Sequence, residues 1–101
     1  MSSLWDILKD CKGFDWDEAN SIHIARHKVL PNEAEDVFFD KANTLYDDLK
    51  HSIKEVRFII IGKTQKGRLL YQVFTKRENK IRILSSRDIN RKEVKLYEKS
   101  T

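Results

Sequence analysis

The sequence predicts an α+β fold in which helices near both ends of the chain flank an antiparallel sheet. Runs of β-branched and aromatic residues separated by short turns fill residues 56–86, as in a meander of strands. Helix start signals precede these runs, and an amphipathic stretch follows them. The chain has 101 residues, of which 40% are hydrophobic, so we expect one domain with a buried core.

Two helices are predicted before the sheet. The first covers residues 17–28, and Asp17 is a suitable N-cap for it. The second covers residues 31–41, and Pro31 lies in its first turn. Residues 14–17 form either an edge strand or a bend. Residues 2–13 form either a short helix or a frayed extension.

The sheet is predicted as a meander. Its strands cover residues 56–64, 68–76 and 81–86, and a weak strand over residues 43–48 precedes them. A final helix over residues 90–99 completes the domain. Helices therefore pack on an antiparallel sheet, with one helix at the C-terminus.

Turn lengths predict the strand register. A two-residue turn at Glu78-Asn79 places Tyr71 opposite Ser86. A four-residue turn in the first hairpin places Phe58 opposite Val73. One face is then the core, and its residues are Val56, Phe58, Ile60, Leu69, Tyr71, Val73 and Leu84. The other face mixes apolar and basic residues: Arg57, Ile59, Ile61, Lys63, Arg68, Leu70, Gln72, Phe74, Ile83, Ser85 and Arg87.

Charge is distributed unevenly along the chain. Residues 1–50 contain six Lys or Arg and eleven Asp or Glu, a net charge of −5, whereas residues 51–101 contain fourteen and five, a net charge of +9. A basic half of this kind either meets a polyanion or is neutralised by the acidic half within the fold.

Regularly spaced arginines on the predicted strands favour the polyanion. The guanidinium group is a planar fork of donors that grips phosphate oxygens and stays charged at physiological pH. We therefore expect a phosphate clamp on nucleic acid. The arginines concerned are Arg57, Arg68, Arg82 and Arg87. The register places Arg82 on the face opposite the other three. The alternative for each is an ordinary surface charge or an ion pair with the acidic half.

The cysteine and histidine content argues against metal and disulfide chemistry. Cys11 is the single cysteine, and His23 and His27, four residues apart on a predicted helix, lack a further ligand at metal-binding spacing. We predict no metal and no cofactor. No apolar run is long enough to span a membrane and no secretory signal is evident, so a cytoplasmic protein without membrane contact is expected.

Several segments, in order, resemble the BrnT-type toxins of bacterial type II toxin–antitoxin pairs. They are Phe14-Asp-Trp-Asp-Glu-Ala19, Arg26-His27, Glu33-Ala-Glu-Asp-Val-Phe38, Arg57-Phe-Ile-Ile-Ile-Gly62, Gly67-Arg-Leu-Leu70, Ile81-Arg-Ile-Leu-Ser-Ser-Arg87 and Arg91-Lys-Glu-Val-Lys-Leu-Tyr-Glu98. The resemblance spans residues 14–98. It divides the chain into an N-terminal extension, residues 1–13, and a BrnT-like domain, residues 14–101.

The resemblance implies a RelE-like small fold and metal-independent endoribonuclease activity that arrests translation. It also implies a BrnA-like antitoxin that covers the toxin and contacts operator DNA, so that the toxin meets DNA only through the antitoxin. The chain departs from the family at two positions. His23 stands where Asn is common, and Lys28 stands where Gly usually follows the Arg-His doublet, which predicts a different end for the first helix.

Cleavage without metal requires attack of the ribose 2′-OH on phosphorus, with proton transfer and positive charge at the phosphorane. His27 is a candidate general base, or else a helix-end packing residue. Glu93 and Tyr97 lie one helical turn apart and are further acid–base candidates, although a core position suits Tyr97 better.

Three further residues are candidates for contacting nucleic acid. Lys63 is a candidate phosphate contact, and Trp16 and Phe74 are either stacking platforms for unpaired bases or packing residues. A catalytically silent protein that binds nucleic acid or antitoxin in transcriptional repression is the alternative function. A protein-interaction module whose basic face meets acidic protein is a third.

Overall fold

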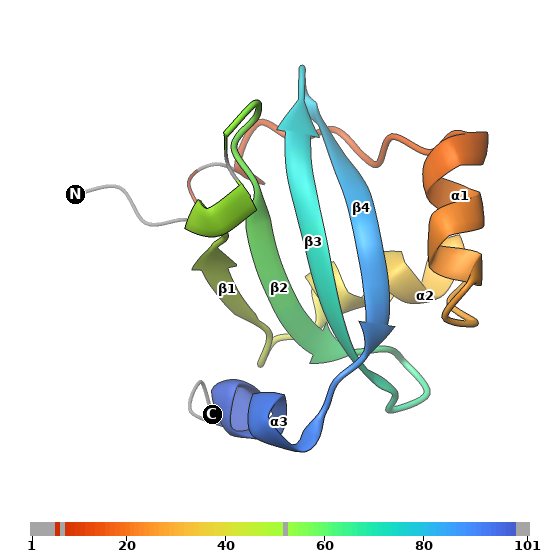
Figure 1. The fold of residues 1–101 in the computed structure, drawn as a ribbon, viewed down its shortest axis with the longest axis vertical. Helices are drawn as coiled ribbons and strands as arrows, with labels where there is room; N and C mark the ends of the chain where they lie inside the picture. Colours follow the sequence, from red (N-terminus) through yellow and green to blue (C-terminus); the bar gives the residue numbers. More distant parts are fainter. Residues whose placement is uncertain (1–5, 7, 52, 99–101) are drawn as a thin grey trace.

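The computed structural model describes residue 6 and residues 8–51 and 53–98. In chain order the elements are α1 (Glu18–Ala25), α2 (Pro31–Asp36), the 3₁₀ turn η2 (Val37–Phe39), β1 (Thr44–Asp47), the 3₁₀ turn η3 (Leu49–His51), β2 (Phe58–Lys63), β3 (Leu69–Arg77), β4 (Lys80–Asp88) and α3 (Arg91–Glu98). The strands form one antiparallel sheet in the order β1-β2-β3-β4. Figure 1 shows α2 behind this sheet, α1 beside β4, and α3 at the end where β2 finishes. The predicted α+β fold with a C-terminal helix is confirmed, and the weak strand is β1.

Side-chain capping begins α1 at the predicted place. Asp17 Oδ1 accepts the backbone N–H of Asn20 at 3.2 Å, and Asn20 Oδ1 accepts that of Asp17 at 2.8 Å. Each side chain thereby satisfies a donor that the first helical turn leaves without a partner. The buried Asn20 amide also donates to the carbonyl of Ile83 in β4 at 3.0 Å, which fastens α1 to the far strand of the sheet.

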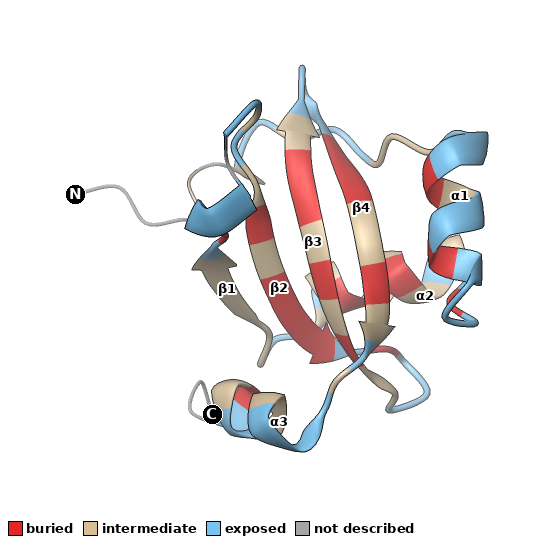
Figure 2. Cartoon of the chain, viewed as in Figure 1, coloured by how far each residue is buried: buried red, intermediate tan, exposed pale blue. Residues whose placement is uncertain are grey.

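The core lies between the sheet and the first two helices. Figure 2 shows burial alternating along most of β3, because successive side chains of a strand point to opposite faces, whereas Ile60, Ile61 and Gly62 of β2 are all buried. The face toward α1 and α2, here called the helix-covered face, contributes Phe58, Ile60, Leu70, Phe74, Ile81 and Ile83. A polar pair is buried with them: the Gln72 amide donates to the Ala34 carbonyl at 3.0 Å and accepts from Ser86 Oγ at 2.7 Å.

The predicted register of the first hairpin is wrong by one residue. Phe58 pairs with Phe74 rather than Val73, because five residues rather than four separate the paired ends of β2 and β3. A one-residue shift exchanges the faces of a strand. Leu69, Tyr71 and Val73 therefore leave the predicted core, and the residues on the helix-covered face of β3 are Leu70, Gln72 and Phe74.

The second hairpin follows the predicted register only near its turn. Thr75 pairs with Arg82 as the turn at Glu78-Asn79 requires, but Tyr71 pairs with Arg87 and not with Ser86. A β-bulge opposite Val73 and Phe74 inserts one extra residue into β4. Beyond it, Ser86 turns to the helix-covered face and Arg87 to the opposite face.

Residues just before α1 run alongside β4. Ile81 donates to the Gly13 carbonyl at 3.0 Å and accepts from the Asp15 N–H at 2.8 Å, which gives a single parallel bridge at Phe14. Leu8 and Cys11 pack against the core. The N-terminal residues predicted to begin a helix lie outside the described part of the chain.

Candidate functional site: the open face of the sheet

The sheet face turned away from α1 and α2 is partly exposed, and we call it the open face. It includes Tyr46, Ile59, Tyr71, Val73, Ser85 and Arg87, which are intermediate in exposure, and also the buried Ile61 and Thr75. On the helix-covered face, by contrast, most side chains are buried. The open face is therefore the part of the sheet available to a ligand.

Arg87 is held in a defined orientation on this face. Its Nη1 and Nη2 donate to the two carboxylate oxygens of Glu93 at 2.8 and 2.7 Å, and its guanidinium group lies over the Tyr71 ring, 4.3 Å from the centroid. This fork-to-fork contact with Glu93 lowers the pKa of that carboxyl and raises the pKa of Arg87. Within the described residues, Nε and one Nη2 hydrogen of Arg87 have no acceptor, so both remain for a ligand.

Tyr71 lies between two acidic groups. Burial, and then the charges of Glu93 and Asp48, raise the pKa of its hydroxyl, although Arg87 acts in the opposite direction. The hydroxyl therefore keeps its proton at neutral pH and is a hydrogen-bond donor on the open face.

Arg57 lies just before β2, on the same side as Ile59. Its carbonyl accepts the N–H of Asp48 at 3.0 Å, which extends the β1–β2 ladder by one pair. Its side chain is 37% exposed and lies 3.9 Å from Glu55. Arg57 lies four positions before Ile61, the residue of β2 that pairs with Tyr71, and Tyr71 in turn pairs with Arg87. The distance along the strand from Arg57 to these paired residues is about 13 Å. Two arginines thus occupy opposite ends of the open face.

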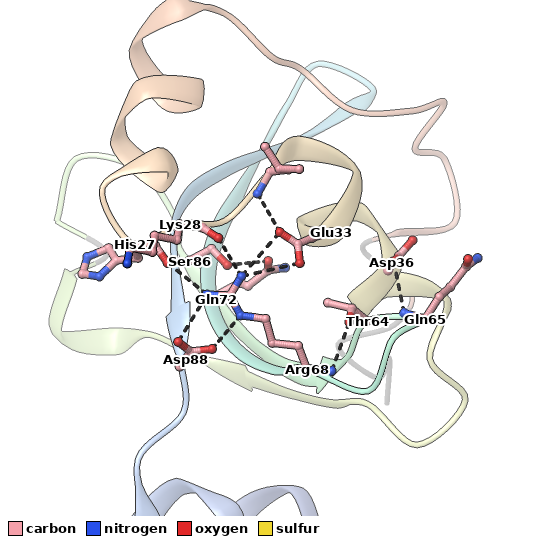
Figure 3. A network of polar contacts seen from close by, with 11 residues as sticks. His27, Lys28, Glu33, Asp36, Thr64, Gln65, Arg68, Gln72, Ser86 and Asp88 are labelled. Carbon is pink, nitrogen blue, oxygen red and sulfur yellow. Dashed lines mark hydrogen bonds and ion pairs between the residues drawn. The ribbon is translucent and has the colours of Figure 1, made fainter.

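The structure gives Arg68 different surroundings from those of Arg57 and Arg87. Its Nε and Nη2 donate to Asp88 at 2.7 and 3.2 Å, and Nη1 and Nη2 donate to the carbonyls of Lys28 and His27 at 2.7 and 3.0 Å. Nη1 also contacts Glu33 at 3.4 Å. Figure 3 shows these acceptors converging on one guanidinium group. All five donors have protein acceptors, so Arg68 joins three segments of the fold.

Arg82 likewise binds within the protein. Its Nη1 lies 3.0 Å from Asp17 and 3.5 Å from Asp15, and only 9% of its side chain is exposed. These ion pairs lower the pKa of Asp17. The acidic half thus neutralises this arginine, which is the alternative reading of the charge pattern. His27 is exposed at the end of α1, beside the Arg68 network rather than on the open face.

The other predicted site residues are divided between surface and core. Lys63 is exposed at the end of β2, with Nζ 5.8 Å from the centroid of the Tyr97 ring. Tyr97 is buried and donates to Asp40 at 2.9 Å. Phe74 is 1% exposed in the core, and Trp16 packs against the core while its indole N–H donates to Glu35 at 2.8 Å.

Sequence reasoning missed a histidine–carboxylate pair beside the open face. His51 Nδ1 lies 3.0 and 3.1 Å from the two oxygens of Asp48, which is itself buried. The signal was present as an Asp and a His three residues apart, but the polar segment around them was interpreted as an ordinary loop.

The described surface also contains hollows away from the sheet face. One of about 210 Å³ lies between α2 and the β2–β3 loop and is lined partly by Glu33 and Asp36. A more apolar hollow of about 290 Å³ is lined by Cys11, Phe14 and Phe38, among others. Carboxylates repel phosphate at the first hollow, and no charged side chain lines the second, so neither hollow suits nucleic acid as well as the open face does.

Residues 16–93 match the family model described as the ribonuclease toxin BrnT of type II toxin–antitoxin systems. The chain belongs to this family. The matched region covers more than half of the chain and contains all of the open-face residues. BrnT toxins are ribonucleases, so RNA is the target and an antitoxin is the partner. A search of curated proteins finds no match to this chain.

One departure from the BrnT pattern has a local structural solution. Lys28 has φ of 58°, the left-handed region that glycine favours. Two residues after the C-cap of α1, Lys28 thus adopts a conformation that glycine would adopt without strain, and the different helix end expected for this chain stays a prediction. The lysine adopts this conformation at an energetic cost that the contact of its carbonyl with Arg68 helps to offset.

Metal-ligand clusters and membrane-spanning helices are both absent from the described part of this BrnT-family chain. Among residues 6, 8–51 and 53–98, no three His, Cys, Asp or Glu side chains gather as a metal site would require. None of the described helices is long and apolar enough to cross a membrane.

Proposed function

We propose that the chain is a metal-independent endoribonuclease that binds RNA on the open face and arrests translation by cutting it in the cytoplasm. The supporting observation is the placement of Arg57 and Arg87 at opposite ends of a partly exposed sheet face, with the Tyr71 ring against the Arg87 guanidinium group. This arrangement offers charged donors and an aromatic ring to a single-stranded RNA.

In the proposed reaction the ribose 2′-OH attacks the adjacent phosphorus and the bond to O5′ breaks. Negative charge increases on the phosphoryl oxygens in the transition state, where donors already held in place are most effective. Glu93 and the Tyr71 ring hold the Arg87 guanidinium group before substrate arrives. Lys63, exposed at the end of β2, contributes a further phosphate contact.

The proposed inhibitor is a BrnA-like antitoxin encoded beside the toxin. It neutralises the toxin by covering the open face, and it alone contacts operator DNA. A partner that covers Arg57 and Arg87 must present acidic or carbonyl groups to them, so RNA and antitoxin compete for one surface.

The test is cleavage of purified RNA in EDTA, with and without added ribosomes. The variant Arg87→Lys keeps the charge but loses the planar fork, and Arg57→Ala removes the second donor group. Arg26→Ala is the matched control, because Arg26 is an exposed arginine at the C-cap of α1. We expect about a hundredfold loss of rate in the two site variants and wild-type rates in the control.

The same samples distinguish the alternative function. RNA binding that weakens as salt increases, without cleavage under either condition, would favour a catalytically silent binder. Equal cleavage by all the variants would place the site elsewhere on the molecule.

A further inference from the structure

The pair formed by His51 and Asp48 has the geometry of an oriented imidazole. Nδ1 of His51 faces the carboxylate at 3.0 Å, so Nε2 lies on the opposite side of the ring. The His51 side chain is 65% exposed, whereas that of Asp48 is 9% exposed. A buried carboxylate thus holds an imidazole whose second nitrogen is accessible, which is the arrangement by which a carboxylate fixes the tautomer of a catalytic histidine.

The pair is attached to the open face by the backbone. Asp48 directly follows β1, and its N–H donates to the carbonyl of Arg57, so the two residues are neighbours across the β1–β2 ladder. Its charge also contributes to the raised pKa of Tyr71, so the carboxylate acts electrostatically across the open face. His51, three residues on in η3, therefore lies at the Arg57 end of the proposed RNA site.

We propose that His51 is the general base of RNA cleavage, with Asp48 as its positioning residue; this inference rests on the proposed function. Nε2 accepts the proton of the ribose 2′-OH while the O2′–P bond forms and the P–O5′ bond breaks. The leaving O5′ takes a proton from solvent, and the His51 imidazolium later returns its proton to solvent. The products are a 2′,3′-cyclic phosphate and a 5′-hydroxyl end, and no other reactant is consumed.

His51 satisfies the requirements of a base better than His27 does. His27 is exposed beside the Arg68 network, where Glu33 and Asp88 repel an approaching phosphate. His51 instead contacts Asp48, the backbone partner of Arg57, whose charge attracts a phosphate. His27 and His51 are both exposed, so the charges around each residue, rather than its exposure, decide which one suits a phosphate substrate.

The test compares His51→Ala with His23→Ala, since His23 is an exposed histidine on α1. We expect His51→Ala to lower kcat about a hundredfold or more, with RNA affinity unchanged and cleavage partly restored by imidazole added to the buffer. Asp48→Asn should lower kcat rather than raise KM, and imidazole should not restore it. His23→Ala should behave as the wild type.

Three results would overturn the inference in distinguishable ways. An active wild type together with an equally active His51→Ala variant would remove His51 from the reaction and leave the proposed function standing. A wild-type chain that cleaves no RNA, with or without ribosomes, would overturn the proposed function and this inference with it. A loss in His51→Ala that imidazole does not rescue, accompanied by weaker RNA binding, would make the residue a binding contact instead.

Discussion

Arg68 and Asp88 form a two-point ion pair, with Nε 2.7 Å from Oδ1 and Nη2 3.2 Å from Oδ2. The pair connects the β2–β3 loop to the end of β4, and the remaining donors of Arg68 reach the carbonyls that follow α1. Hydrogen bonding to Arg68 lowers the pKa of Asp88. The Arg68 guanidinium group takes the place of water as the donor to several acceptors at once, so it stabilises the fold.

We expect Arg68→Ala to lower the free energy of unfolding by about 2 kcal/mol, because it leaves two carboxylates and two carbonyls without their donor. Urea denaturation measures the change. Arg77→Ala is the control: the Arg77 side chain is half exposed and, among the described residues, pairs with Glu55 at 3.4 Å, so its loss should cost less than about 1 kcal/mol. A fully stable Arg68→Ala variant that no longer binds RNA would return Arg68 to the phosphate clamp expected from sequence.

Lys28→Gly should stabilise the protein by about 0.5–1 kcal/mol. Lys28 has φ of 58°, where a β-carbon is disfavoured and glycine is not. The exposed Lys66 has no positive φ, so Lys66→Gly should instead lower stability through the greater freedom of the unfolded chain. Thermal unfolding of the two variants gives shifts of opposite sign if the conformation at Lys28 is as described.

Glu93 should make stability depend on pH. Hydrogen bonding to Arg87 holds the pKa of Glu93 below its usual value of 4.5. The stability that the Glu93–Arg87 ion pair contributes is therefore complete above pH 4.5, and it is lost as the pH falls through the lower pKa that Glu93 has in the folded state. We expect Glu93→Gln to be less stable than wild type by about 1 kcal/mol at pH 7, and the difference to shrink at pH 3. An equal difference at both values would mean that the ion pair contributes nothing.

The Tyr97 hydroxyl should lose its proton at a higher pH than an ordinary tyrosine does. Burial, together with its hydrogen bond to Asp40, raises the pKa of Tyr97 from 10.0 to about 12. A raised pKa means that the associated stability is present below pH 10 and is lost as the pH rises through about 12. The pKa of Tyr71 is also raised, so the titration uses a Tyr71→Phe background, in which the late step of tyrosinate absorbance should remain with Tyr46→Phe and disappear with Tyr97→Phe. Its persistence in Tyr97→Phe would contradict the assignment.

Local signals made most of the elements predictable. Asp17 caps α1 and Pro31 begins α2, as their side-chain chemistry requires, and the turn after Arg77 sets the first pairs of the second hairpin. The faces of β3 were not predictable, since both of its alternating sets contain large apolar residues. Only pairing with β2 and β4 decides between them, and a buried Gln72 with its own hydrogen bonds conceals the core face.

The arginines of the candidate site were predictable from the sequence, but their contacts were not. Arg57 and Arg87 reach the open face as expected, whereas acceptors distant in sequence engage Arg68 and Arg82. Nothing local to an arginine reveals whether the fold brings a carboxylate to it. His51 and Asp48 are close in sequence, but the role proposed for them depends on Arg57, which lies just before β2 and accepts the backbone N–H of Asp48.

The contact between α1 and β4 also constrains the timing of folding during synthesis. The Asn20 amide bonds to Ile83, 63 residues later, and Asp17 meets Arg82 after 65 residues. Until β4 emerges from the ribosome, α1 lacks the strand with which it makes most of its contacts to the sheet. The nascent chain thus completes its core only when Arg87, on that same strand, is also available. Completion of the core and assembly of the proposed cutting surface therefore coincide.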